Sequence, residues 1–113
     1  MAEFTINKKE QHAEISVNVE KLDSSVSPLL KSELVLLNSE GIKYILLDLK
    51  GARYCDSSGL SAILVGNRLC KNSGGKFVLC NLNDTVKKLI SISQLDSILN
   101  LASSVEEGLE KLS

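Results

Sequence analysis

Two short apolar runs constrain the fold of this chain more than any other feature. Residues 43–49 (KYILLDL) and 76–80 (KFVLC) are almost continuously apolar and too short for typical helices. Strands without polar alternation are expected where both faces of a sheet are covered. Between them, apolar residues recur at the helical period at Leu60, Ile63 and Leu64. This strand–helix–strand unit predicts two adjacent parallel strands in the interior of one sheet.

The flanking segments predict the rest of the fold. Alternating apolar and polar residues at 2–8 and 12–19 predict an antiparallel opening hairpin, and residues 98–102 predict a last short strand. Apolar residues at helical spacing predict helices over residues 25–40, from Leu60 to Cys70, over 84–92 and over 104–112. We therefore expect an α/β fold with a mixed, mostly parallel β-sheet flanked by about four α-helices.

Size and charge limit the functions to consider. The chain has 113 residues, enough for one domain, with 13 Lys and Arg against 14 Asp and Glu. Because there is no excess of positive charge to neutralise phosphates, we do not expect a nucleic-acid partner. No apolar run approaches the ~18 residues that would span a bilayer, and the first residues carry no signal-peptide pattern. We expect a cytoplasmic protein without membrane insertion.

The cysteines are expected to be structural. Cys55, Cys70 and Cys80 are an odd number of cysteines at irregular spacing, without a CxxC pair, and His12 is the only histidine. This pattern suits neither a disulfide framework nor a zinc site. The sequence therefore predicts three reduced thiols packed as small hydrophobic side chains, and no metal site.

A short polar stretch, DSSGL at residues 56–60, opens the helical segment that follows residues 43–49. In open α/β sheets, functional groups lie where the carboxyl end of a strand gives way to a helix. The first backbone N–H groups of a helix lack intrahelical partners and favour negative charge. A serine there can cap the helix, and a phosphate on the same serine would face those N–H donors. The stretch is therefore our candidate functional site.

The same stretch also has a purely structural interpretation. Asp56, Ser57 and Ser58 are all of residue types that commonly cap helices. Gly59 would allow the helix to pack closely against the sheet. These residues alone leave both interpretations open.

Two longer stretches resemble a known family. CDSSGLSAIL (55–64) opens the helix after the central strand. In GGKFVLCNLNDTVKKLI (74–90), a glycine pair, a basic residue, a buried strand and a Val-Lys-Lys-Leu helix follow one another. This arrangement, over nearly all of the chain, resembles the STAS domain family, the anti-sigma factor antagonists. The resemblance implies a STAS-type fold in one domain over residues 1–113.

The resemblance also implies a phosphorylation switch. In antagonists of this family, the first serine after the aspartate accepts phosphate from a partner that is both anti-sigma factor and serine kinase. That position is Ser57 here, and Ser58 is the second candidate. The unphosphorylated protein binds the anti-sigma factor and frees the sigma factor, phosphorylation ends the binding, and a serine phosphatase restores it. The domain itself then needs no catalytic residue and no cofactor.

The resemblance places Asp23, Asp56, Ser57, Ser58 and Gly59 at the partner-binding surface. Asp56 would orient the Ser57 hydroxyl or help the kinase to recognise the loop, and the alternative is a helix cap. Asp23 matches an aspartate that the family keeps near the phosphorylated loop, and its alternative role is in the cap region of the helix over 25–40.

The segment around Asp23 departs from the family pattern. The family has a glycine, an acid, leucine and aspartate, followed a few residues later by Thr-Ala. This chain has instead Glu20, Lys21, Leu22 and Asp23, followed by Val26, Ser27 and Pro28. These positions flank the expected docking face, so the departure concerns the partner that the protein binds. The apolar period of the following helix is the same as in the family, so the expected fold is unchanged.

Two other classes of function remain to be compared. A STAS domain can serve as a constitutive scaffold or subunit, for example in a signalling assembly or a lipid-transport complex, in which the serine is never modified. An enzyme with Ser57 as nucleophile is disfavoured, because DSSGL lacks the Gly-x-Ser-x-Gly elbow and His12 lies in the predicted first hairpin.

Overall fold

The two apolar runs lie side by side in the middle of the sheet. In the computed structural model, which describes residues 3–113, β4 (Tyr44–Asp48) and β6 (Lys76–Cys80) pair in parallel, with Ile45 opposite Phe77. The five-stranded sheet has the order β1-β2-β4-β6-β7, so both strands are interior. The predicted adjacent parallel strands are confirmed.

The outer strands complete a mixed sheet. β1 (Phe4–Lys8) and β2 (His12–Val17) form the predicted antiparallel hairpin, β2 runs parallel to β4, and β7 (Asn100–Ala102) runs parallel to β6. The predicted first strand began at Ala2, which lies outside the described residues. The second strand ends at Val17, two residues earlier than expected, because the chain there leaves the sheet.

A second, two-stranded sheet was not predicted. β3 (Lys21–Leu22) pairs in parallel with β5 (Tyr54–Cys55), beyond the end of the main sheet. Strands of two residues have no hydrophobic period, so the sequence carries no signal for them. The expected direct passage from the central strand into a helix is therefore wrong: residues 49–53 and β5 lie between β4 and that helix.

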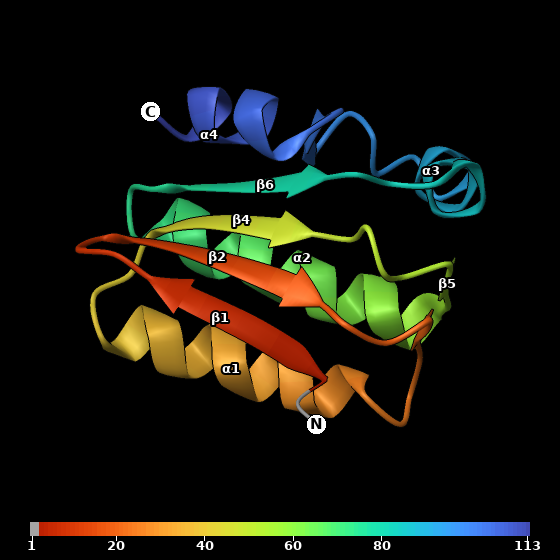
Figure 1. Ribbon diagram of the computed structural model, residues 1–113, viewed down its shortest axis with the longest axis horizontal. Coiled ribbons are helices and arrows are strands. Elements are labelled where there is room, and N and C mark those ends of the chain that lie inside the picture. The colour runs from red at the N-terminus through yellow and green to blue at the C-terminus, as the bar shows by residue number, and fades with distance from the viewer. Residues whose placement is uncertain (1–2) are drawn as a thin grey trace.

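The helices cover both faces of the sheet (Figure 1). α1 (Ser27–Ser39) and α2 (Ser57–Asn72) lie on one face, α4 (Val105–Leu112) lies on the other, and α3 (Asp84–Ile92) lies at the end of the sheet near β5. None of the helices within residues 3–113 combines the length and the apolar character that crossing a membrane requires.

Alternate residues of β4 supply two hydrophobic clusters. Ile45 and Leu47 pack with buried residues of α1 and α2, whereas Leu46 packs in a second cluster with Leu112 of α4. In β6, Phe77 and Val78 divide between the clusters in the same way. This double burial explains why the two strands are apolar at nearly every position.

The ends of the first two helices follow from local chemistry. α1 begins at Ser27, two residues later than expected, because Asp23 holds the preceding residues in a turn. Leu29, one of the apolar residues at helical spacing in this segment, lies away from the core and is 40% exposed. After α2, Gly74 adopts a positive φ of 81°, as expected for a glycine that terminates a helix.

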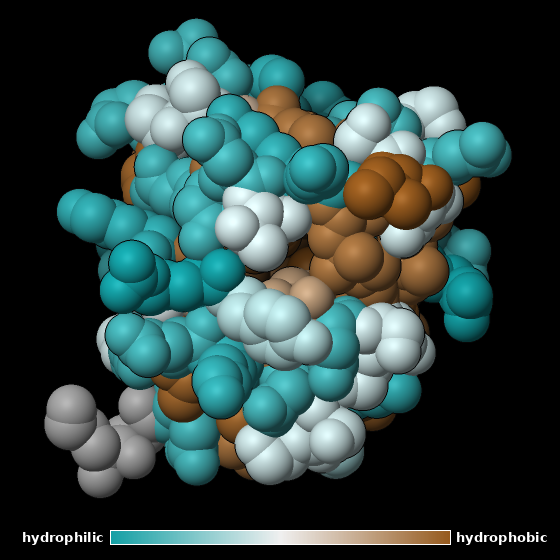
Figure 2. Space-filling model, turned by 90° about the vertical axis from the view of Figure 1, so that its right-hand side faces the viewer, coloured by the Kyte–Doolittle hydropathy of each residue, from teal (hydrophilic) through white to brown (hydrophobic). Residues whose placement is uncertain are grey.

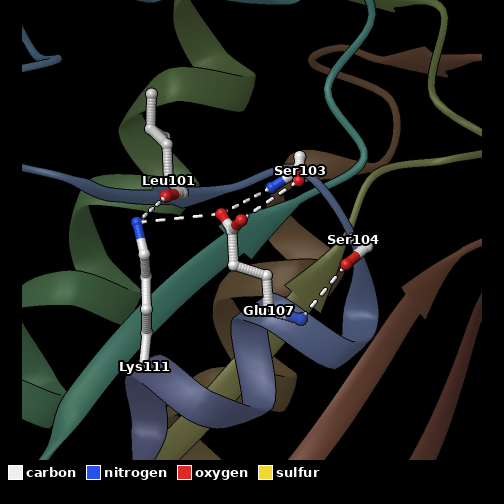
Figure 3. Close-up of polar contacts among 5 residues, drawn as sticks. All are labelled: Leu101, Ser103, Ser104, Glu107 and Lys111. Carbon is white, nitrogen blue, oxygen red and sulfur yellow. Dashed lines mark hydrogen bonds and ion pairs between the residues drawn. The ribbon is translucent and has the colours of Figure 1, made fainter.

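A compact polar network fixes the start of α4 over the sheet (Figure 3). The Ser104 hydroxyl accepts a hydrogen bond from the Glu107 backbone N–H at 3.1 Å, and the Glu107 carboxylate accepts one from the Ser103 N–H at 3.0 Å. Lys111 lies 4.0 Å from that carboxylate and donates to the Leu101 carbonyl. This variant of a capping box joins β7 to α4, so the helix is held where it covers β4 and β6.

All three cysteines are free and buried, as predicted. Burial raises the pKa of Cys55 and Cys70 to about 11 each and that of Cys80 to about 12. Because the thiolate is the reactive form, we expect the native protein to react slowly with a thiol reagent near neutral pH, and the denatured protein to react rapidly at three thiols per chain. Rapid labelling of Cys70 or Cys80 in the native protein would contradict the burial described above.

Candidate functional site

The DSSGL stretch lies at one end of the molecule, at the edge toward which the parallel strands run (Figure 1). Ser57 is the first residue of α2 and its side chain is exposed. Within residues 3–113, the Ser57 hydroxyl has no hydrogen-bond partner. It is therefore open to another molecule from solvent.

Asp56 is the N-cap of α2. One of its carboxylate oxygens, Oδ1, accepts hydrogen bonds from the backbone N–H of Ser58 at 2.9 Å and of Gly59 at 3.0 Å. The same oxygen accepts a third hydrogen bond from the Ser58 hydroxyl at 2.6 Å. Of the candidate caps that the sequence left open, Asp56 is therefore the one used: its carboxylate accepts hydrogen bonds from the free N–H groups, and Ser57 is the first residue inside the helix.

These hydrogen bonds keep Asp56 ionised. The bond from the Ser58 hydroxyl, and then the bond from the Gly59 N–H, hold the pKa of Asp56 below its ordinary value of 3.8. A negative charge beside the start of α2 also suits the helix dipole. Near neutral pH, a carboxylate therefore lies next to the Ser57 position.

A chain of hydroxyl contacts connects this helix start to the segment before α1. The Ser58 hydroxyl lies 3.3 Å from that of Ser27, which donates to the Asp23 backbone carbonyl at 2.6 Å. Ser27 is only 1% exposed and is the buried polar residue of the described core. Two segments that are distant in sequence are thus joined through two serines, and Ser58 is already engaged on both sides.

Asp23 lies close to Asp56, as the sequence analysis expected. β3 pairs with β5 so that Leu22 is opposite Cys55, and each aspartate follows directly. The Asp23 carboxylate accepts hydrogen bonds from the Ser25 hydroxyl at 2.6 Å and the Ser25 N–H at 3.0 Å, and these lower its pKa. Asp23 therefore shapes the turn before α1, while its side chain does not serve as the N-cap of that helix.

Gly59 lies where α2 passes closest to β3. A Cβ atom at this position would be 2.3 Å from the Leu22 carbonyl oxygen and 2.6 Å from the Cys55 sulfur. Backbone cannot move aside as a flexible side chain can, so the position has no room for any side chain. The close packing expected of Gly59 is present, and it is against β3 and β5.

Ser27 is the residue of this site that sequence reasoning missed. Ser27 occupies a position at which the chain departs from the family pattern, and that departure is the signal in the sequence that points to it. His12 lies at the start of β2, at the opposite edge of the sheet from Ser57. The structure therefore brings together the five predicted residues and Ser27, and it keeps the histidine away from them.

Figure 2 shows this end of the molecule face-on. Hydrophilic side chains cover most of it, and an apolar area interrupts them on one side. Exposed hydrophobic residues of the neighbouring elements include Tyr54 of β5 (47% exposed) and Ile92 of α3 (70% exposed). A crevice of about 570 Å³ also opens beside the ends of β4 and β6, lined by Asp48, Asn81 and the start of α4 but not by Ser57.

The sequence matches the model of the STAS domain over residues 5–108. The chain belongs to the STAS domain family. The anti-sigma-B factor antagonist of Bacillus subtilis (strain 168) is 28% identical over 108 residues, which cover 95% of this chain and 98% of the relative. The anti-sigma F factor antagonist of Paenibacillus polymyxa is 28% identical over 93 residues, which cover 81% and 80%.

Solved structures of family members share the fold. The anti-sigma factor antagonist SpoIIAA in its unphosphorylated form superposes with a TM-score of 0.81 at 20% identity, over 96% of this chain and 94% of that one. SpoIIAA of Bacillus in its phosphorylated form gives a TM-score of 0.75 at 20% identity, over 97% and 99%. The STAS-type α/β fold inferred from the sequence is confirmed.

The close approach at Gly59 leads to a testable prediction. Gly59→Ala should lower the free energy of unfolding by about 1–3 kcal/mol, because the new methyl group must push α2 away from the Leu22 carbonyl. Urea unfolding measures this change, and Ser61→Ala on the exposed side of the same helix is the matched control. Equal stability of the two variants would show that α2 does not pack against β3 as described.

The lowered pKa of Asp56 predicts a pH dependence of stability. Because the folded-state pKa lies below the ordinary 3.8, the unfolded chain binds more protons in this range. The stabilisation is complete above the unfolded pKa and is lost as the pH falls through the folded pKa. Asp56→Asn keeps an acceptor but does not titrate, so its stability should fall less between about pH 5 and about pH 3 than that of the wild type. If urea unfolding shows that the free energies of unfolding of the wild type and of Asp56→Asn fall equally as the pH is lowered, the lowered pKa is not that of Asp56.

Proposed function

We propose that this protein is an anti-sigma factor antagonist whose binding is switched by phosphorylation of Ser57. When Ser57 is unphosphorylated, the protein binds an anti-sigma factor with serine kinase activity, and sigma-factor-dependent transcription proceeds. Phosphorylation by that partner ends the binding, and a serine phosphatase restores it. The protein acts as a binding protein and not as an enzyme, in the cytoplasm.

The observation that carries this proposal is the difference between the two serines. Ser57 is exposed with a free hydroxyl, whereas the Ser58 hydroxyl is held between Asp56 and Ser27. A kinase needs a hydroxyl that can reach its active site, so Ser57 is the better acceptor. The names of the relatives, antagonists of anti-sigma-B and anti-sigma F factors, support the choice of partner.

The proposed switch acts by charge. A phosphate adds about −1.5 to −2 charges near neutral pH, and the Asp56 carboxylate already lies beside it. At a protein contact, such a group brings a desolvation cost and repels any acidic group of the partner. The surface that binds the partner would include Ser57, Ser58, Asp56, Asp23 and Gly59.

Substitutions at Ser57 test the proposal. Ser57→Ala should change the free energy of unfolding by no more than about 0.5 kcal/mol, because the hydroxyl has no hydrogen bond within the described residues, and should still capture the partner from a native lysate. Ser57→Asp should keep the fold but weaken partner affinity by about tenfold or more. Ser58→Ala, which removes the hydroxyl held by Asp56 and Ser27, is the matched control for which of the two hydroxyls carries the phosphate.

Mass spectrometry then locates the phosphate. After incubation of the captured partner with ATP, we expect phosphate on Ser57 in the wild type and in Ser58→Ala, and none in Ser57→Ala. Phosphate on the Ser57→Ala protein would show that another hydroxyl is the phosphate acceptor. A partner that binds wild type and Ser57→Asp equally, with no phosphate in protein from native cells, would indicate a constitutive STAS scaffold instead.

A further inference from the structure

β1 forms an open edge of the main sheet. The strand order β1-β2-β4-β6-β7 leaves one side of β1 and one side of β7 without a neighbouring strand. β7 has three residues, whereas β1 has five, pairs with β2 without a bulge and contains no proline. Proteins commonly shorten or interrupt their edge strands, because a long regular edge pairs with other strands. β1 is therefore the edge at which a further strand can be added.

The free backbone groups of β1 are those of its even-numbered residues. The Lys9 N–H donates to the His12 carbonyl at 2.7 Å, so the odd-numbered residues are those that bond to β2. In an antiparallel pair, the residues between them direct both backbone groups away from the partner strand. The N–H and C=O groups of Phe4, Ile6 and Lys8 therefore point outward, and within residues 3–113 they have no hydrogen-bond partner.

We propose that β1 pairs with β1 of a second copy of this chain, in antiparallel orientation about a two-fold axis at Ile6. The two copies then contribute the same strand, as an isologous dimer requires. In this register, the N–H and C=O groups of Ile6 bond to those of Ile6 in the other copy, and Phe4 exchanges hydrogen bonds with Lys8. Every outward backbone group of β1 gains a partner, and the two five-stranded sheets become one.

The side chains of this segment favour a second copy as the occupant. In the proposed register, Thr5 lies opposite Asn7 and Glu3 lies opposite Lys9, all on one face of the joined sheet. Glu3 and Lys9 are exposed and have no ion-pair partner within residues 3–113. Opposite charges directly across a strand pair are stabilising, and a register shifted by two residues would separate them. The second copy thus supplies the complementary charge at both ends of the pairing.

The side of α1 beside this edge exposes apolar residues that the second copy would cover. Lys8 pairs with Glu40 at 3.2 Å, which places this side of α1 next to β1 (Figure 1). Leu36 lies one turn before Glu40 on the same ridge and is 52% exposed, and Leu29 is 40% exposed two turns earlier. Strands pair about 4.8 Å apart and helices pack about 8–10 Å apart, so pairing of the strands brings the two α1 helices together. β1 contributes no residue to the proposed partner-binding surface, so the dimer does not depend on the proposed function.

Charge reversal tests the register by sedimentation equilibrium. Glu3→Lys places two lysines opposite each other, and Lys9→Glu places two glutamates opposite each other, so each should raise the dimer dissociation constant about tenfold. An equimolar mixture of the two variants restores both opposite-charge pairs and should dimerise at least as tightly as the wild type. Glu110→Lys, at an exposed site of α4, is the matched control and should dimerise like the wild type. A mixture that dimerises no more tightly than either variant alone would overturn the proposal.

Amide hydrogen exchange of the unmodified chain provides the second test. The N–H groups of Thr5 and Asn7 bond to β2 and should be protected at every protein concentration. Those of Phe4, Ile6 and Lys8 should exchange rapidly in dilute protein and become protected as the dimer forms. Rapid exchange of these three groups in a dimeric sample would show that the dimer forms through another surface. A chain that stays monomeric up to about 1 mM would likewise refute the proposal.

Discussion

The burial of β4 and β6 on both faces is the constraint on which the rest of the structure depends. Because neither face can meet water, α1 and α2 must cover one side and α4 the other. The parallel pairing of β4 and β6 in turn requires that the chain cross the sheet through α2. The N-terminus of α2 therefore lies at the edge of the sheet where the parallel strands end.

At that edge, packing and polar chemistry act on the same few residues. The contact of Gly59 with Leu22 fixes how far α2 lies from β3, and the hydrogen bonds of Asp56 fix where its first turn begins. The Ser27–Ser58 contact adds a third connection, between α2 and α1. Ser57 lies among these fixed points but takes part in none of them, so a change at its hydroxyl leaves the scaffold intact.

The sequence predicted the elements with strong periodicity and failed where periodicity is absent. The five strands of the main sheet and the four helices are long enough for a hydrophobic period to be recognised. β3 and β5 have two residues each, which is too short for any period. Sequence reasoning also identified the DSSGL residues but left open whether Asp56 or a serine caps the helix, because Asp and Ser cap helices about equally well and only the backbone geometry decides between them. Ser27 was missed because its role depends on a contact with Ser58, 31 residues away.

The electrostatics of the helix start suggest why such a switch can be strong without unfolding the domain. A phosphate on Ser57 would repel Asp56 and the nearby Asp23, yet it would also face the positive end of the α2 dipole. These two effects would oppose each other inside the domain, so each would offset part of the other in folding. A docked partner receives no such compensation from α2 once it covers the phosphate and excludes water from it. The cost of the charge would then fall mainly on binding, which is what the proposed switch requires.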